Sequence, residues 1–328
     1  MEKVALGKDG PIISRVGLGC MGMAGVYGSR DSSEAIATLR HALDIGVTLL
    51  DTADFYGPGT SEQLVGKALA GDGERAFVAT KFGMRRSPEG RPYVDGSPDY
   101  TRKACDASLL RLGVDEIDLY YLARVDPNVP VEETVGTMGE LVASGKVRYV
   151  GLCEVSSRTL RRAHAVHPIT ALQTEYSLWE RHVEGGILDT VRELGVGFVA
   201  YRPLGSGFLA GAVATPEELD PADWRRNDPR FQQENFEHNQ KMLNELESVA
   251  KAKGATVAQL ALAWVLSRGR DIIAIPGTSR RAHLDMNVAA ADICLTDDES
   301  EDIGSLFPPT DVAGTRYPEA ILRTIDQD

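Results

Sequence analysis

The chain has 328 residues, of which 43% are hydrophobic and 25% are charged, as in ordinary globular proteins. Its formal net charge of −13 argues against a general affinity for nucleic acid, because phosphates attract basic surfaces. No apolar run reaches the length of about 18 residues that a membrane helix needs, and the first residues do not begin a signal peptide. We therefore expect a cytoplasmic protein that binds neither membranes nor nucleic acid.

Short apolar runs alternate along the chain with amphipathic stretches, a pattern that predicts βα units around a parallel sheet. The sequence predicts eight strands, at residues 16–20, 48–52, 76–80, 117–122, 147–153, 171–174, 198–201 and 271–275. The expected helices cover residues 33–45, 61–69, 101–112, 131–144, 158–166, 186–194, 240–253, 256–267 and 281–290. Several are followed by a glycine of the kind that ends helices, namely Gly46, Gly113, Gly145, Gly195 and Gly254. Eight such units indicate a (β/α)8 barrel.

Three further segments complete the single domain that we expect over residues 1–328. Residues 3–13 predict a small hairpin before the barrel, because Asp9-Gly10 is a strong turn signal. Residues 205–238 form a long polar connection after the seventh strand. A connection of that length more often has a function than serves only as a linker. Residues 297–306 begin a C-terminal helical appendage.

The cysteines are scattered, at positions 20, 105, 153 and 294. None belongs to a CxxC pair, and no histidine lies at metal-ligand spacing from them. We therefore expect reduced thiols, as in cytosolic proteins, and no metal site.

Polar residues follow several of the apolar runs, at the end of a barrel where active sites lie. Asp51, Tyr56 and Lys81 are expected to meet there. A phenol with an ordinary pKa of about 10 needs a nearby cation to release its proton near neutrality. Lys81 can supply that charge, and Asp51 can keep Lys81 protonated. Taken singly, Asp51 also fits a structural ion pair and Tyr56 a structural loop residue. Together the three predict a general acid for the reduction of a carbonyl group.

Five motifs in this order resemble the aldo-keto reductase superfamily, and the resemblance runs from residue 4 to about residue 290. They are LDTADFYG at 50–57, ATKFG at 79–83, DLYYL at 118–122, AYRPLG at 200–205 and IPGT at 275–278. The segment LGSGFL at 204–209 is similar to the bacterial and plant branch of this superfamily. The resemblance implies a (β/α)8 barrel and a catalytic tetrad of Asp, Tyr, Lys and His. Asp51, Tyr56 and Lys81 match the first three, whereas Ala123 stands where the histidine is expected.

The surroundings of Ala123 otherwise fit the superfamily, since Arg124-Val125-Asp126-Pro127 follows it. An intact neighbourhood around one missing catalytic group favours a substitution introduced into an active enzyme, with natural loss as the alternative. Either origin predicts a weakened reductase, because alanine can neither orient a carbonyl group nor join a proton relay.

The resemblance also implies NADPH or NADP+ as the cofactor. Gln173 is expected to hydrogen-bond the nicotinamide carboxamide with help from Cys153 and Glu154. Cys153 stands where the superfamily usually has serine, and a thiol is the weaker donor. Tyr201 is expected to stack on the nicotinamide ring. The pyrophosphate is expected against the backbone of the following segment, where glycine permits close approach, at Pro203, Leu204, Gly205 and Gly207.

The helix expected after the eighth strand begins behind residues whose amides and helix dipole suit a phosphate, namely Gly277, Thr278, Ser279 and Arg280. Arg280, with Arg281 or His283, is expected at the 2′-phosphate of the adenosine, which favours NADPH over NADH. Asn287 falls where the superfamily contacts adenine. The alternative is a helix start that only faces solvent.

We expect a small carbonyl substrate against a largely apolar wall formed by Met23, Tyr27, Phe82, Trp179 and Trp224. Such a wall fits many carbonyl compounds, so the sequence leaves the substrate open, and it leaves self-association open as well. Two functions compete with a reductase of aldehydes or ketones. One is a non-catalytic regulatory protein that binds NADPH, like the potassium-channel β subunits of the same fold, which the missing histidine favours. The other is a Schiff-base aldolase that uses Lys81.

Overall fold

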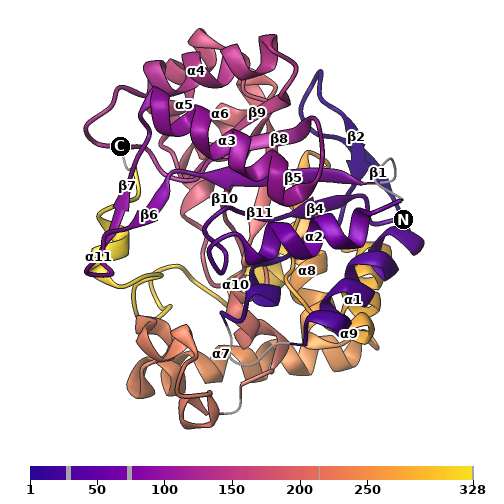
Figure 1. The fold of residues 1–328 in the computed structure, drawn as a ribbon. Helices are drawn as coiled ribbons and strands as arrows, with labels where there is room; N and C mark the ends of the chain where they lie inside the picture. Colours follow the sequence, from indigo (N-terminus) through magenta and orange to yellow (C-terminus); the bar gives the residue numbers. More distant parts are fainter. Residues whose placement is uncertain (27–30, 72–75, 214, 327–328) are drawn as a thin grey trace.

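The computed structural model describes residues 1–26, 31–71, 76–213 and 215–326. In this part of the chain, eight parallel strands form one curved sheet (Figure 1). Their spatial order is β3 (Leu18–Gly19), β4 (Leu49–Asp51), β5 (Phe77–Phe82), β8 (Ile117–Leu122), β9 (Val147–Cys153), β10 (Ala171–Glu175), β11 (Gly197–Tyr201) and β12 (Ile272–Ala274). Parallel bridges from Val16 to Ala274 and from Gly19 to Gly277 join the two edges. The (β/α)8 barrel predicted from the sequence is confirmed.

The predicted helices follow the strands, and all but α7 (Gln233–Ala252), described below, have bounds within three residues of those expected. They are α1 (Ser32–Asp44), α2 (Thr60–Leu69), α3 (Pro98–Leu112), α4 (Val131–Ala143), α5 (Ser157–Val166), α6 (Ile187–Leu194), α8 (Val257–Ser267), α9 (Arg281–Ala289) and α10 (Asp297–Ser305). Side chains cap several helix starts: Thr256, for example, forms a capping box with Gln259 before α8. The five glycines predicted to end helices have φ between 68° and 87°, the left-handed region that glycine adopts without strain.

Two apolar layers hold the barrel together. The inner layer fills the barrel with side chains from alternate strand positions, among them Leu49, Leu119, Val199 and Ile273. The larger outer layer lies between strands and helices. Gly151 permits a close approach in the inner layer, because a Cβ atom there would lie 2.4 Å from the ring of Tyr121.

The N-terminal hairpin, β1 (Lys3–Ala5) and β2 (Ile12–Ser14), is also confirmed. Ile13, in β2, and Leu6, directly after β1, are at most 1% exposed. Both belong to the inner layer, which also contains Leu49 and Phe77, the first residues of β4 and β5. The hairpin therefore closes the end of the barrel opposite the mouth where the strands end.

The connections differ from the prediction in two places. A second hairpin, β6 (Met84–Arg86) and β7 (Pro92–Val94), follows β5. It was not predicted because its strands are only three residues long and their exposed residues, Arg85, Arg86, Pro92 and Tyr93, show no apolar alternation. The connection after β11 ends earlier than predicted, since α7 (Gln233–Ala252) begins at Gln233 instead of residue 240. The polar first turns of α7 are fixed by a tertiary contact: the Phe236 ring packs edge-on against Phe208.

The same connection contains short 3-10 helices, namely η4 (Gly205–Ala210), η5 (Pro216–Glu218), η6 (Trp224–Asn227) and η7 (Pro229–Phe231). Others lie elsewhere, at η1 (Met21–Ala24), η3 (His182–Gly185) and η8 (Ala290–Asp292). The C-terminal appendage continues past α10 to the short helix α11 (Glu319–Leu322).

Candidate active site

A buried ion pair joins Asp51 and Lys81 at the C-terminal ends of the neighbouring strands β4 and β5. Lys81 Nζ lies 2.5 Å from Asp51 Oδ1 and donates a second hydrogen bond to the Thr52 carbonyl oxygen at 2.8 Å. The two side chains are 3% and 4% exposed. Burial acts to lower the pKa of Lys81, but Asp51 and Tyr56 outweigh burial and raise that pKa above its ordinary value. Lys81 is therefore held as a cation.

Tyr56 lies beside this pair, with its ring centroid 5.3 Å from Lys81 Nζ. Phe55 packs edge-on against the same ring. Burial raises the pKa of Tyr56 above its ordinary value, and the charge of Lys81 acts in the opposite direction. Lys81 thus acts on Tyr56 in the direction expected from the sequence, but burial is the larger influence. Tyr56 accordingly keeps its proton at neutral pH, which suits a donor to a strong base such as an alkoxide.

Cys153 ends β9, and Gln173 is the central residue of the neighbouring strand β10. Gln173 Nε2 donates a hydrogen bond to Asp51 Oδ2 at 2.8 Å, so the amide assigned to nicotinamide from the sequence is engaged with the ion pair. Cys153 is 2% exposed, and burial raises the pKa of its thiol to about 12. Cys153 is therefore a neutral thiol and a weak hydrogen-bond donor.

Ala123 follows β8 directly, and its amide donates to the Phe82 carbonyl oxygen at 2.8 Å. Because β8 lies between β5 and β9, Ala123 belongs to the same ring of strand ends as Lys81 and Cys153. Its side chain is 1% exposed and offers no polar atom. Arg124 is also buried, and its Nη1 donates to the Ala123 carbonyl oxygen at 2.7 Å.

The C-terminal appendage reaches this mouth, although the sequence resemblance ended before it. Arg316 Nη2 lies 2.7 Å from Glu154 Oε2, so the glutamate expected near the nicotinamide is paired with an arginine. The Tyr317 hydroxyl lies 2.8 Å from the Tyr201 hydroxyl. Sequence reasoning missed Arg316 and Tyr317, because an Arg-Tyr pair in a polar terminal segment belongs to no periodic pattern.

The segment after β11 adopts left-handed backbone conformations, with φ of 54° at Gly205 and 93° at Gly207. A Cβ atom on Gly205 would lie 2.6 Å from the Trp179 ring. Gly205 therefore makes room for Trp179, a role that the sequence did not reveal. At Gly207 the nearest atom to such a Cβ is Arg225 Nη1, at 3.3 Å. Pro203 is buried, and Leu204 is half-buried beside them.

The start of α9 presents the residues expected at the 2′-phosphate. Arg280 is exposed at the N-cap, behind Gly277, Thr278 and Ser279. Arg281 is paired with Glu34, whose Oε1 lies 3.1 Å from Arg281 Nε. Within residues 1–26, 31–71, 76–213 and 215–326, no carboxylate lies within 4.0 Å of the Arg280 guanidinium. His283 is exposed and Asn287 is buried. Arg280 and His283 are therefore the exposed basic groups here that form no ion pair with a described carboxylate.

The apolar wall expected for the substrate is largely part of the core. Phe82 is fully buried and stacks on Tyr120 with ring centroids 4.7 Å apart. Trp179 is 2% exposed and stacks on Phe208 at 4.0 Å, and Met23 is 1% exposed. Trp224 is half-buried beside the Arg202 guanidinium. Tyr27 lies outside the described residues.

Within the described ranges, no group of three or more His, Cys, Asp or Glu side chains could hold a metal ion. None of the helices described is long and apolar enough to cross a membrane. The four cysteines are free thiols, of which Cys294 is exposed.

Comparison with known proteins agrees with this fold. The sequence model of the Aldo/keto reductase family matches residues 15–307. A glycerol dehydrogenase from Gluconobacter oxydans is 32% identical, with a TM-score of 0.85 over 94% of this chain and 96% of that chain. An aldo/keto reductase from Klebsiella pneumoniae, in complex with NADP and acetate, is 27% identical, with a TM-score of 0.74 over 97% of this chain and 99% of that chain. The chain belongs to the aldo/keto reductase family.

Proposed function

We propose that this protein reduces aldehydes or ketones to alcohols with NADPH. The observation that carries the proposal is the buried ion pair of Lys81 and Asp51, 5.3 Å from the ring centroid of the protonated Tyr56. A fixed cation beside a phenol suits proton donation to a developing alkoxide. Family membership supports carbonyl reduction in general.

The residues at the start of α9 fit the adenosine 2′-phosphate of NADPH. Helix α9 has nine residues, and its N-terminal amides suit an anion. Arg280 is an exposed cation at that terminus, and none of the described carboxylates lies within 4.0 Å of it. Related solved structures from Klebsiella pneumoniae contain NADP or NADPH, which supports the same cofactor for this chain. Gln173, in the middle of β10, and Tyr201, at the end of β11, are the residues that we assign to the nicotinamide.

Bound NADPH supplies the hydride that reduces the carbonyl carbon. Tyr56 holds the proton that the carbonyl oxygen receives. As this proton leaves, the negative charge on the phenol is stabilised by Lys81, which is already charged and oriented. Asp51 keeps Lys81 protonated, and the Thr52 carbonyl oxygen fixes a second ammonium proton. The charges are in place before the reaction, so little reorganisation adds to the barrier.

With Ala123 in place of a histidine, this arrangement lacks a side chain that orients the carbonyl group. In the family pattern a histidine at this position orients the carbonyl group, and an alanine side chain has no hydrogen-bonding atom. Positioned acid–base groups typically contribute about 10²–10⁴-fold to the rate. We therefore propose a reductase whose activity is lowered toward the smaller end of that range and not abolished, since Tyr56 and Lys81 remain.

A non-catalytic protein that binds NADPH is the second candidate, and Ala123 is the observation that favours it. The Schiff-base alternative is opposed by the raised pKa of Lys81, because an amine must be neutral to attack a carbonyl carbon. The deciding experiment follows NADPH oxidation with a panel of reactive aldehydes. Slow turnover that Lys81→Met lowers by a further factor of about 10²–10⁴ supports the reductase. Binding of NADPH with no turnover, both before and after Ala123→His, supports the regulatory protein.

A further inference from the structure

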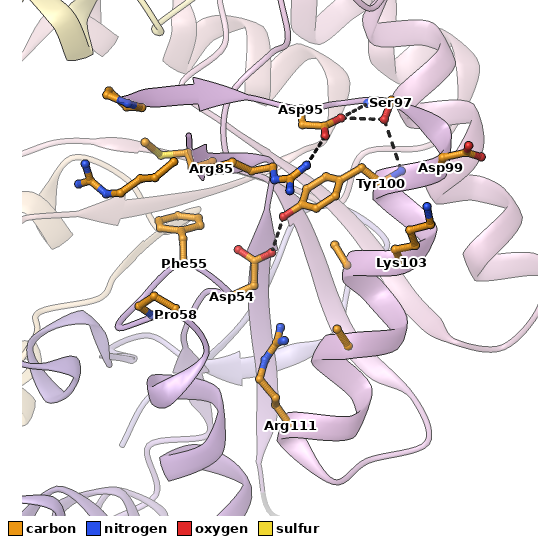
Figure 2. A pocket seen from close by; sticks show the side chains of 15 residues that line it. Asp54, Phe55, Pro58, Arg85, Asp95, Ser97, Asp99, Tyr100, Lys103 and Arg111 are labelled. Carbon is orange, nitrogen blue, oxygen red and sulfur yellow. Dashed lines mark hydrogen bonds and ion pairs between the residues drawn. The ribbon is translucent and has the colours of Figure 1, made fainter. Parts of the chain in front are cut away.

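A cavity of about 830 Å³ lies between the loop that carries Tyr56, the β6–β7 hairpin and α3 (Figure 2). Its size falls within the usual range of small-molecule sites, roughly 300–1,000 Å³. Tyr56, Lys81 and Ala123 do not line it, so the cavity is distinct from the candidate active site. The wall is mainly apolar, through Phe55, Pro58, Met84, Pro92 and Tyr100.

One polar group in this wall has an unused hydrogen-bonding position. The Asp54 carboxyl group faces the space between the Phe55 ring and the Tyr100 hydroxyl (Figure 2). Asp54 Oδ2 accepts a long hydrogen bond from Tyr100, at 3.4 Å. Asp54 Oδ1 is buried and has no partner among the described residues. A buried oxygen without a donor is unfavourable, so a donor ligand in the cavity gains if the Asp54 carboxyl group turns to present Oδ1 to it.

The nearby cations do not satisfy Asp54, because each is bonded to another carboxylate. Arg85 Nη1 lies 2.7 Å from Asp95 Oδ2, and Arg111 Nε lies 2.5 Å from Glu62 Oε2. Burial and repulsion by Glu62 raise the pKa of Asp54 to about 7, although Arg111, the bond from Tyr100 and Arg85 act to lower it. Asp54 is therefore about half ionised at neutral pH, and a bound cation would favour its ionised form.

The structure assigns to this cavity a binding site for a small primary ammonium ion with a flat apolar body. The ammonium group donates a charge-assisted hydrogen bond to the Asp54 carboxyl group, which turns so that Oδ1 faces the cavity. The apolar body lies against Phe55 and Pro58, from which it displaces water. Two cations at the rim, Lys103 and Arg86, repel an ammonium ion, but both are exposed, so water and salt screen that repulsion. The net charge of −13 adds a general attraction for cations.

The test compares two ligands of nearly the same shape, benzylamine and benzyl alcohol, by calorimetric titration of the protein at pH 8. We expect the ammonium to bind at least about tenfold more tightly than the alcohol, because only the ammonium forms an ion pair with Asp54. Lowering the pH to 5.5 protonates Asp54 and should weaken benzylammonium binding by more than about tenfold. Equal affinity for the two ligands, no binding of either, or an affinity independent of pH would each overturn the assignment.

Three variants locate the site. Asp54→Asn keeps the shape of the side chain and removes its charge, so the preference for the ammonium should disappear. Asp99→Asn is the matched control, because the Asp99 side chain is 88% exposed at the rim of the same cavity, and it should change the affinity less than about twofold. Ala107→Leu leaves Asp54 intact and fills part of the cavity, so it should weaken both ligands. If Asp54→Asn fails to fold, Ala107→Leu alone tests whether the ligands bind in this cavity. Unchanged binding of both ligands to Ala107→Leu contradicts the proposal.

Discussion

The hydroxyl oxygens of Tyr201 and Tyr317 lie 2.8 Å apart, although 116 residues separate them in the sequence. Tyr201 ends β11, and Tyr317 belongs to the C-terminal appendage. The adjacent Arg316 fixes the appendage to Glu154 through an ion pair of 2.7 Å. A segment outside the repeating βα units therefore determines how the Tyr201 ring is held at the barrel mouth.

Tyr317→Phe should weaken NADPH binding, because it leaves the Tyr201 hydroxyl without this partner. One net hydrogen bond is worth about 0.5–1.5 kcal/mol, so we expect the Kd for NADPH to rise by about two- to thirteenfold. Quenching of intrinsic fluorescence by NADPH measures the change. Tyr93→Phe is the control, since Tyr93 is exposed on the β6–β7 hairpin. An unchanged Kd in Tyr317→Phe would show that Tyr317 does not position the nicotinamide site.

Lys81→Met should lower turnover by about 10²–10⁴-fold, because it removes the cation that stabilises the deprotonated Tyr56. It should also destabilise the fold, since Asp51 is left charged and buried. Breaking a buried ion pair in this way typically costs about 3–5 kcal/mol. Single-turnover rates with bound NADPH and thermal unfolding measure the two effects.

The double variant Asp51→Asn/Lys81→Met separates stability from catalysis. Asparagine is neutral and can still accept the hydrogen bond that Gln173 Nε2 donates. We expect the double variant to regain part of the lost unfolding free energy while its turnover stays low. Recovery of turnover together with stability would mean that Lys81 acts only through the fold.

Ala123→His should raise kcat/KM for a reactive aldehyde by about tenfold or more, since it supplies a positioned polar group beside Tyr56. The Kd for NADPH should change little, because the residues assigned to the cofactor lie on or after β9, β10 and β11, between β12 and α9, and in α9. Ala123→Leu is the control for volume, as the position is 1% exposed. An unchanged rate with NADPH shown to be bound would favour the regulatory candidate.

Arg280→Ala should narrow the preference for NADPH over NADH by about 1–3 kcal/mol, the worth of a charge-assisted hydrogen bond to a phosphate. Arg281→Ala should have a smaller effect, because Arg281 is paired with Glu34. Parallel titrations with the two cofactors measure the preference. If the parent protein binds NADPH and NADH equally, the assignment of Arg280 to the 2′-phosphate is wrong.

The sequence alone determined the barrel and the neighbourhood of Asp51 and Lys81. Alternating apolar runs and helix-ending glycines are local signals, and each reflects how one segment must bury its apolar face. Parallel strands end at the same side of a barrel. Residues that follow successive strands therefore meet at one mouth, as the 2.5 Å pair of Asp51 and Lys81 shows.

Only the tertiary structure decided which of the singled-out side chains are buried and which are bonded to another residue. Arg281 is engaged by Glu34, 247 residues away, and Phe82 and Trp179 are enclosed by other aromatic rings. Tyr317 reaches Tyr201 from a segment without any recognisable pattern. The period of a strand or helix specifies which face is buried, whereas contacts between distant segments depend on how whole elements pack. Such packing places the C-terminal appendage beside the strand ends, and no local pattern in the sequence encodes that position.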